Sequence, residues 1–158
     1  MLQRDYPDQV CSVARSLEVI GERWTLLILR DAVVGMERFE EFQQSLGIAS
    51  NVLTNRLKLL CDEQVLERVP DAERPGRPKY VLTGKGRQLA PALLVLMKWG
   101  DRYYPTAGGP PRLTLHVGCG GNIGADFRCD RCGKPFEPGD IEFHPGPGAP
   151  RERAKAKR

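Results

Sequence analysis

The sequence predicts a mainly α-helical, α+β domain with one small β-hairpin, followed by a small appendage rich in Cys and Gly. Apolar residues recur at helical spacing through most of residues 8–103. One Pro- and Gly-rich loop separates two short runs of strand-forming residues, and the composition changes sharply near residue 104. We therefore divide the chain into a helical domain, a linker, an appendage and a basic disordered tail, at 1–104, 105–112, 113–143 and 144–158.

Size, composition and charge narrow the class of protein. The chain has 158 residues, of which 41% are hydrophobic and 28% charged, which suits one domain with a small appendage. It contains neither the roughly 18 consecutive apolar residues of a membrane helix nor a secretory signal, so we expect a cytoplasmic protein. The net charge of +4 comes from the tail at 151–158, and the rest of the chain sums to zero. Any case for nucleic-acid binding must therefore depend on where the charges lie.

Four helices are expected before the hairpin. The first three cover about 10–20, 24–32 and 38–46. Each is followed by a terminating glycine, namely Gly21, Gly35 and Gly47. The fourth begins at Ser50, whose hydroxyl we expect to accept hydrogen bonds from the free amides, and its apolar stripe is Leu53, Leu57 and Leu60. The third and fourth helices, separated by a three-residue turn, form a helix-turn-helix pattern.

A hairpin and a long helix follow. Two strand-like runs at 66–69 and 79–82 bracket a loop from Asp71 to Pro78. A hairpin with a basic tip behind a helix-turn-helix is a wing, so the domain is predicted to be a winged helix-turn-helix. Thr83 to Gly86 then lead into a helix from Leu89 to Trp99, which is more apolar than a small domain can cover. We expect a second copy of the chain to cover it.

The exposed face of the fourth helix carries groups that can read bases. Asn51, Asn55 and Lys58 lie opposite the leucine stripe on a helical wheel, with Thr54 beside them. Asn can pair with adenine, Lys can reach guanine or phosphate, and a Thr methyl can contact thymine. The alternative interpretation is an ordinary solvated surface.

The hairpin loop favours the nucleic-acid interpretation. From Arg74 to Gly100 there are six basic residues and no acidic one. Arg74, Arg77 and Lys79 lie on or beside the loop, where they can reach phosphate or a minor groove. The helix and the loop are separate in sequence and indicate the same ligand, double-stranded DNA.

Three segments together resemble the HxlR family of bacterial winged-helix transcription regulators, which is related to the MarR group: CSVARSLEVIGERWTLLILRD, ERFEEFQQSLGIASNVLTNRLKLLCDEQVLERV and RPKYVLTGKGRQLAPALLVLMKWGD. The resemblance implies a homodimer, built through the N-terminal and long C-terminal helices, on pseudo-palindromic promoter DNA. By position it places Ser50, Asn51, Thr54, Asn55, Arg56 and Lys58 on the recognition helix and Arg77 at the wing tip. We expect a repressor, because a winged helix seated on a promoter blocks polymerase.

The cysteines suggest two further properties. His116, Cys119, Cys129 and Cys132 form two ligand pairs, each separated by two residues, as in a structural zinc knuckle. Reduced cysteines in a loose tail, or a disulfide between Cys129 and Cys132, are the alternatives. Cys11 matches the N-terminal cysteine that some members of the family use as a redox or electrophile sensor. A thiol at a helix start has a lowered pKa, but Cys11 can equally be a small core residue.

Two other functions fit the sequence less well than DNA binding. A thiol oxidoreductase would use Cys129 and Cys132, but Gly133 and Pro135 interrupt the helix that such a motif needs. No phosphate loop or catalytic triad is apparent, so we expect no enzyme. A zinc-containing protein-interaction module would favour aromatic anchors over the polar face around Asn55.

Overall fold

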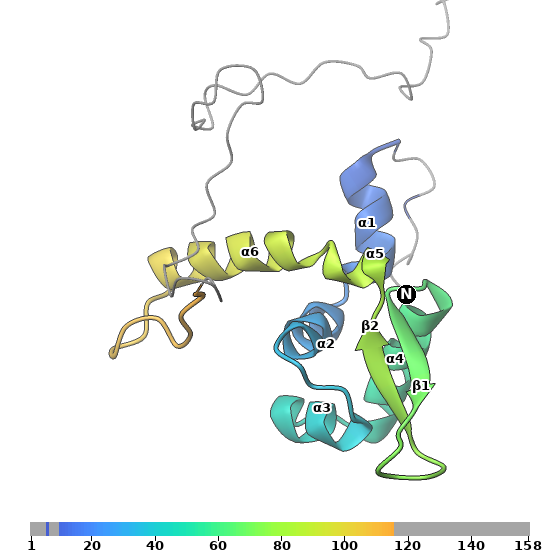
Figure 1. The fold of residues 1–158 in the computed structure, drawn as a ribbon. Coiled ribbons are helices and arrows are strands. Elements are labelled where there is room, and N and C mark those ends of the chain that lie inside the picture. The colour runs from blue at the N-terminus through green and yellow to red at the C-terminus, as the bar shows by residue number, and fades with distance from the viewer. Residues whose placement is uncertain (1–5, 7–9, 116–158) are drawn as a thin grey trace, which may run out of the picture.

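The protein adopts a winged helix-turn-helix fold in a computed structural model that describes residue 6 and residues 10–115 (Figure 1). In chain order the elements are α1 (Ser12–Ile20), α2 (Arg23–Val33), α3 (Phe39–Leu46), α4 (Ser50–Asp62), β1 (Leu66–Pro70), β2 (Pro78–Leu82), α5 (Gly84–Arg87) and α6 (Ala90–Tyr103). The mainly helical α+β prediction with a single hairpin is confirmed for this part of the chain.

The core lies between α2, α3, α4 and the base of the hairpin. Its buried apolar residues are Ile28, Leu29, Ala32, Phe42, Ile48, Leu53, Leu57, Leu60, Val65 and Leu66. The three leucines of α4 are buried because their spacing of three and four residues places them on one face of the helix. The opposite face of α4 is consequently left to solvent.

A short turn joins α3 to α4 and sets the helix-turn-helix geometry. Gly47 has a φ of 61° and donates its amide to Gln43 O at 2.9 Å, which ends α3 in a left-handed cap. The expectation that Ser50 caps α4 is wrong, because Ala49 takes the capping position. Ser50 is already within the first turn, and its hydroxyl accepts a hydrogen bond from Gln43 Nε2 at 2.9 Å. The serine therefore links the two helices.

The hairpin is attached to the start of α3. β1 and β2 pair antiparallel from Leu66 opposite Leu82 to Pro70 opposite Pro78, so each strand is one residue longer than predicted. Proline is tolerated at these strand ends, where its missing amide breaks no central pairing. Tyr80 N donates to Glu37 O at 2.7 Å, which places the residues before α3 along the other side of β2.

The segment after the hairpin contains a helix that was not predicted. Thr83 to Gly86 were expected to lead directly into the long helix, but Gly84–Arg87 form the separate one-turn helix α5. Thr83 Oγ1 caps this turn by accepting the amide of Gly86 at 3.0 Å. Pro91 has no amide hydrogen to donate to Arg87 O four residues earlier, so the two helices do not merge.

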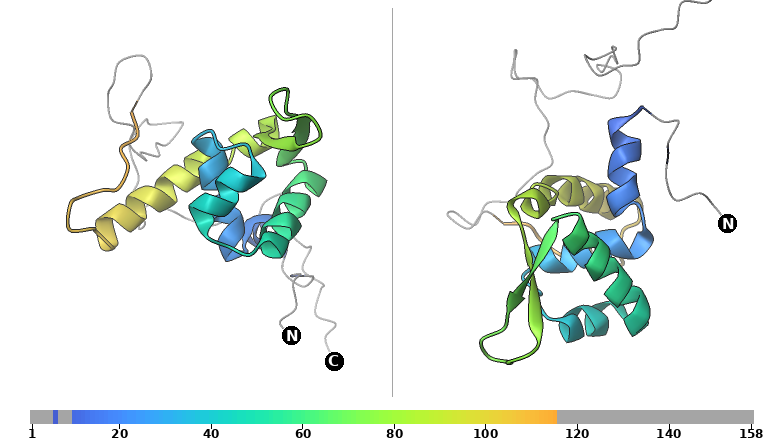
Figure 2. Two further views of the ribbon diagram at one scale, coloured as in Figure 1. Left: turned by 90° about the horizontal axis from the view of Figure 1, so that it is seen from below. Right: turned by 90° about the vertical axis from the view of Figure 1, so that its right-hand side faces the viewer.

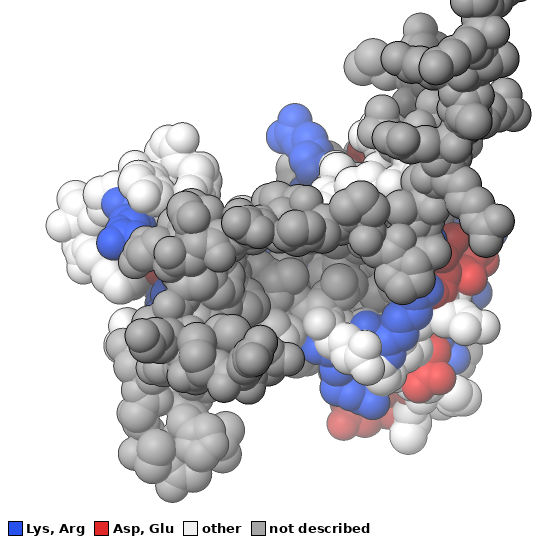
Figure 3. All heavy atoms as spheres, turned by 90° about the horizontal axis from the view of Figure 1, so that it is seen from above, with Lys and Arg blue, Asp and Glu red and all other residues white. Residues whose placement is uncertain are grey.

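The first and last helices leave apolar side chains uncovered. α1 and α6 lie on the side of the molecule opposite α3 and the hairpin loop (Figures 1 and 2). Seen from above, the visible surface beside the C-terminal end of α6 is mostly free of charge, whereas basic and acidic groups are intermixed on the side of the molecule that holds the hairpin (Figure 3). Within residues 10–115, no helix is long and apolar enough to cross a membrane.

Candidate nucleic-acid interface

The exposed face of α4 presents the polar residues that the helical wheel predicts. These residues are Ser50, Asn51, Thr54, Asn55 and Lys58, and all five are exposed. The buried leucines on the opposite face fix the rotation of the helix, because turning it would expose the core. The structure therefore brings hydroxyl, amide and ammonium groups together on one solvent-facing surface.

The side chains on this face of α4 differ in how many of their polar groups are free to bind a ligand, because some already have partners within the chain. Thr54 Oγ1 donates to Ser50 O at 2.8 Å, so its methyl group is the part free to contact a ligand. Lys58 Nζ lies 2.6 Å from Asp62 Oδ2, one turn along the helix. The amide of Asn55 has no hydrogen-bond partner in the part of the chain that the structure describes, so both its donor and its acceptor are available.

Arg56 lies apart from the other α4 residues. Its side chain is 17% exposed, and its guanidinium pairs with Glu22 Oε1, at the start of α2, over 3.2 Å. This ion pair ties α4 to α2. The position of Arg56 in sequence implies a DNA contact, but its placement makes it the least accessible of the predicted α4 residues.

The wing tip is a tight turn with an arginine at each end. Arg77 N donates to Arg74 O at 3.0 Å, closing a four-residue turn. Pro75 supplies the second position, and Gly76 has a φ of 83°, which only glycine adopts readily. This is a type II turn, whose ends lie within about 7 Å of each other. The two arginine side chains therefore leave the wing from neighbouring points.

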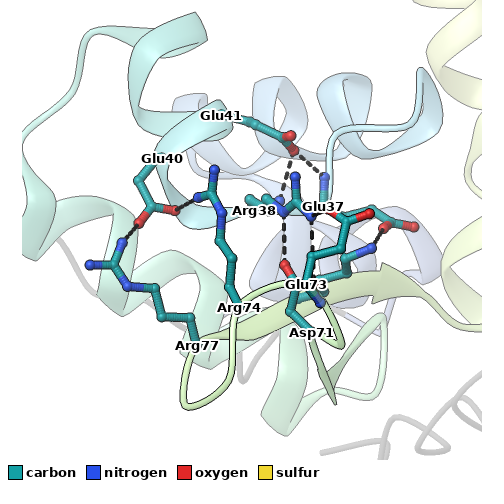
Figure 4. Close-up of polar contacts among 9 residues, drawn as sticks. Glu37, Arg38, Glu40, Glu41, Asp71, Glu73, Arg74 and Arg77 are labelled. Atoms are coloured by element: carbon teal, nitrogen blue, oxygen red, sulfur yellow. Dashed lines mark hydrogen bonds and ion pairs between the residues drawn. The ribbon is translucent and has the colours of Figure 1, made fainter.

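An acidic cluster at the start of α3 faces the wing (Figure 4). Glu40 accepts a hydrogen bond from Arg77 Nη1, and its other oxygen lies 3.8 Å from Arg74 Nη1. Lys79 Nζ lies 3.2 Å from Glu37 Oε2. Each of the three predicted wing cations thus has a carboxylate partner, which the sequence alone does not predict. The ERFEEF segment contains these acids, but its sequence does not show that they face the hairpin.

A second ion pair holds the base of the wing loop. Arg38 Nε donates to Asp71 Oδ2 at 2.8 Å, and Arg38 also donates to Glu73. Asp71 Oδ1 accepts the amide of Glu73 at 3.0 Å, which shapes the start of the loop. The Asp71 side chain is only 2% exposed. Arg38, directly before α3, thereby anchors the wing to the helix-turn-helix.

The Arg38 guanidinium lowers the pKa of Asp71, so stability should depend on pH at this site. The stabilisation is complete above the pKa of an unfolded aspartate, about 3.9, and is lost as the pH falls through the lower folded value. Asp71→Asn should therefore lower the melting temperature at pH 7, and the difference from the parent protein should shrink below about pH 4.

Thermal unfolding at pH 7 and pH 3 measures this difference. Asp62→Asn is the control, because it removes an exposed i,i+4 pair that contributes little. Equal losses from Asp71→Asn at both pH values would contradict a role for the charged pair.

The two cysteines in the described residues have different surroundings. Cys11 is exposed at the position that precedes α1, and the amides of Ala14 and Val13 lower the pKa of its thiol. It is thus not part of the core of this chain. Cys61 is partly buried in α4, and burial raises the pKa of its thiol. Of the two, Cys11 has the more reactive environment.

The predicted zinc ligands His116, Cys119, Cys129 and Cys132 lie outside the described residues. Within residue 6 and residues 10–115, no group of three or more His, Cys, Asp or Glu residues could hold a metal ion. The predicted appendage at 113–143 likewise lies mostly outside these residues, and the predicted tail at 144–158 lies wholly outside them.

Comparison with known proteins identifies the family. Residues 19–107 match the model of the HxlR-like helix-turn-helix. The chain belongs to this family. An HTH-type transcriptional regulator of Mycobacterium tuberculosis is 43% identical to it over 137 residues, which cover 87% of each chain. This member of the HxlR-like family is thus a helix-turn-helix transcription regulator.

Solved structures agree with the HxlR-like fold. The transcription-factor candidate PA1607 is 38% identical in sequence to this chain. Its crystal structure matches with a TM-score of 0.77, and the match covers 85% of this chain and 94% of PA1607. The redox regulator HypR in its reduced form is 30% identical, with a TM-score of 0.54, and the match covers 58% of this chain and 92% of HypR. The described HxlR-like domain thus has the architecture of both.

Proposed function

We propose that this HxlR-like regulator acts as a homodimer that binds pseudo-palindromic operator DNA and represses transcription. The exposed face of α4 carries the proposal, because it combines the unpartnered amide of Asn55 with the neighbouring Asn51 and Lys58. In this arrangement α4 enters the major groove, and the wing lies beside the phosphates. Repression follows from occupation of promoter DNA, because the bound dimer excludes polymerase.

Exposed apolar groups on α1 and α6, and directly beside these two helices, support the dimer. They are Val10, Val13, Leu17, Leu96, Trp99, Tyr103 and Tyr104. Contiguous apolar surface on a soluble chain commonly marks a protein interface, and most homo-oligomers are two-fold dimers. A second copy would bury these helices and leave both α4 helices facing outward. The half-sites would then lie about 10 base pairs apart, or a small multiple of this distance.

Mapping of bound sites in cells, combined with transcript levels with and without the protein, tests the function. The proposal expects bound promoters whose transcripts rise when the gene is deleted. Falling transcripts at those promoters would replace repression with activation, and the absence of bound promoters would overturn the DNA-binding function itself.

We further propose that Cys11 makes DNA binding responsive to thiol oxidation. Its exposed thiol, with a lowered pKa, precedes α1 and lies beside the apolar residues assigned to the dimer interface. The likeness to the redox regulator HypR supports the same idea. Oxidation or alkylation would add bulk at this interface, and so would change the spacing of the two α4 helices.

Diamide is therefore expected to change the DNA affinity of the parent protein and of Cys61→Ser, but not that of Cys11→Ser. Binding to one operator duplex before and after treatment measures this, with zinc content checked in each sample. An unchanged affinity of the oxidised parent protein would show that Cys11 has no sensing role.

We also propose that His116, Cys119, Cys129 and Cys132 bind a structural zinc ion. Their paired spacing and the few large apolar residues of 113–143 support it, because such a segment needs a metal to fold. The 137-residue match to the mycobacterial regulator supports a shared segment here, since it omits only 21 of the 158 residues.

Purified protein is expected to contain about one zinc ion per chain, and Cys129→Ser should lose it whereas Cys61→Ser retains it. A chelator should then expose residues 113–143 to protease while the helical circular-dichroism signal persists. Metal analysis that finds no zinc, with all three late thiols freely titratable, would contradict this site.

A further inference from the structure

The wing of the free protein is not a positively charged surface, although its sequence is basic. The wing loop and the start of α3 together hold four cations and five carboxylates within one network (Figure 4). The cations are Arg38, Arg74, Arg77 and Lys79, and the carboxylates are Glu37, Glu40, Glu41, Asp71 and Glu73. The positive charge expected to attract DNA phosphates is thus already neutralised by carboxylates of the same chain.

Glu40 has a distinctive position in this network. The type II turn places Arg74 and Arg77 side by side, and the two carboxylate oxygens of Glu40 face one guanidinium each. A DNA phosphate likewise presents two free oxygens to arginine side chains. The carboxylate of Glu40 therefore occupies the place that a phosphate would take between the two wing arginines.

The ion pairs around Glu40 are exposed and can exchange partners, unlike the ion pair between Arg38 and Asp71 at the base of the wing. The side chains of Glu40, Arg74 and Arg77 are 48%, 46% and 68% exposed. Exposed pairs of this kind contribute little and break readily. Arg38 and Asp71, by contrast, are 20% and 2% exposed, so that pair keeps the hairpin in place. The tip can change partners while the wing stays attached to α3.

We propose that Glu40 acts as an internal competitor of DNA phosphate for Arg74 and Arg77, and so limits the DNA affinity of the wing. This inference rests on the proposed DNA-binding function. When the wing meets DNA, each arginine transfers from Glu40 to a phosphate oxygen, and Glu40 is left to attract a cation from solution. The competitor weakens binding to all DNA equally, because phosphates carry no sequence information. Stable binding then depends more strongly on the base contacts of α4.

Glu40→Gln tests the competitor because it removes the charge and preserves the size of the side chain. The variant should bind both operator and random duplex DNA about three to ten times more tightly at 50 mM salt, since two exposed ion pairs in each subunit no longer have to be broken. Its plot of log affinity against log salt should also be steeper, by up to about one for each subunit, because no cation is taken up by residue 40.

Two controls separate this effect from a simple change in net charge. Glu67→Gln removes the same charge from an exposed position on β1 that has no ion-pair partner among the described residues, and it should change affinity by less than twofold. In an Arg74→Ala/Arg77→Ala background, Glu40→Gln should give no gain. Circular dichroism of each variant confirms that the domain is folded.

The outcomes distinguish the inference from the function on which it rests. If the parent protein binds no duplex at 50 mM salt, the proposed DNA-binding function fails, and the inference fails with it. If the parent binds but Glu40→Gln matches Glu67→Gln, or gains affinity without the two arginines, only the competitor role is overturned.

Discussion

Replacing Trp99 with aspartate is expected to convert the proposed dimer to monomers and to lower operator affinity by about 100-fold or more. Trp99 is 51% exposed on α6, and its ring lies 5.4–5.6 Å from the rings of Tyr103 and Tyr104. A buried aspartate would be desolvated without a partner, which strongly opposes association. A monomer engages one half-site, and so loses the gain of about 10²–10⁴ that linked binding sites provide.

Sedimentation at micromolar concentration and binding to an operator duplex together measure this effect. Trp99→Phe is the matched control, because it keeps an apolar aromatic group and should remain dimeric. Circular dichroism should show a folded domain for both variants, since Trp99 lies outside the buried core. A monomeric Trp99→Asp protein with normal operator affinity would show that DNA binding does not need the dimer.

Asn55→Ala is expected to weaken binding to the operator by about 30-fold or more and to change binding to random DNA much less. Asn55 is exposed on α4, and its amide has no partner within residue 6 and residues 10–115. A bidentate amide contact to adenine discriminates against other bases by about 1–3 kcal/mol, and a dimer loses it twice. Non-specific binding depends on phosphate contacts, which this change leaves intact.

Competition between operator and random duplexes at fixed salt measures the difference. Arg77→Ala is the contrasting variant, because a phosphate contact contributes equally on every sequence, and its loss should also flatten the salt dependence. Equal losses from Asn55→Ala on both duplexes would exclude base reading by this residue.

Much of the fold could be predicted because its signals are local in the sequence. The leucines of α4 all lie on one face of the helix, and the turn at Gly47 separates two helices clearly. The Pro- and Gly-containing loop predicts the hairpin to within one residue at each strand end. The break between α5 and α6 was missed, because Pro91 is acceptable early in a helix and only the observed backbone shows where α6 begins.

The site was predictable on α4 and much less so on the wing. The polar face follows from the same periodicity that buries the leucines, so Asn55 could be placed from sequence alone. The partners of the wing cations could not, because Glu40 and Arg77 are separated by 37 residues and meet only in the folded chain. The pairing of Arg56 with Glu22 depends in the same way on how α4 packs against α2.

Selection of binding sites from a random DNA library by the full chain tests most directly the claim that the exposed face of α4 reads DNA as part of a dimer. The enriched sequences should contain an inverted repeat, with half-site centres about 10 base pairs apart or a small multiple of this distance. The same selection with Asn55→Ala should relax the preference at one position in each half-site. Enrichment of no sequence by the folded parent protein, or of the same repeat by Asn55→Ala, would contradict this account.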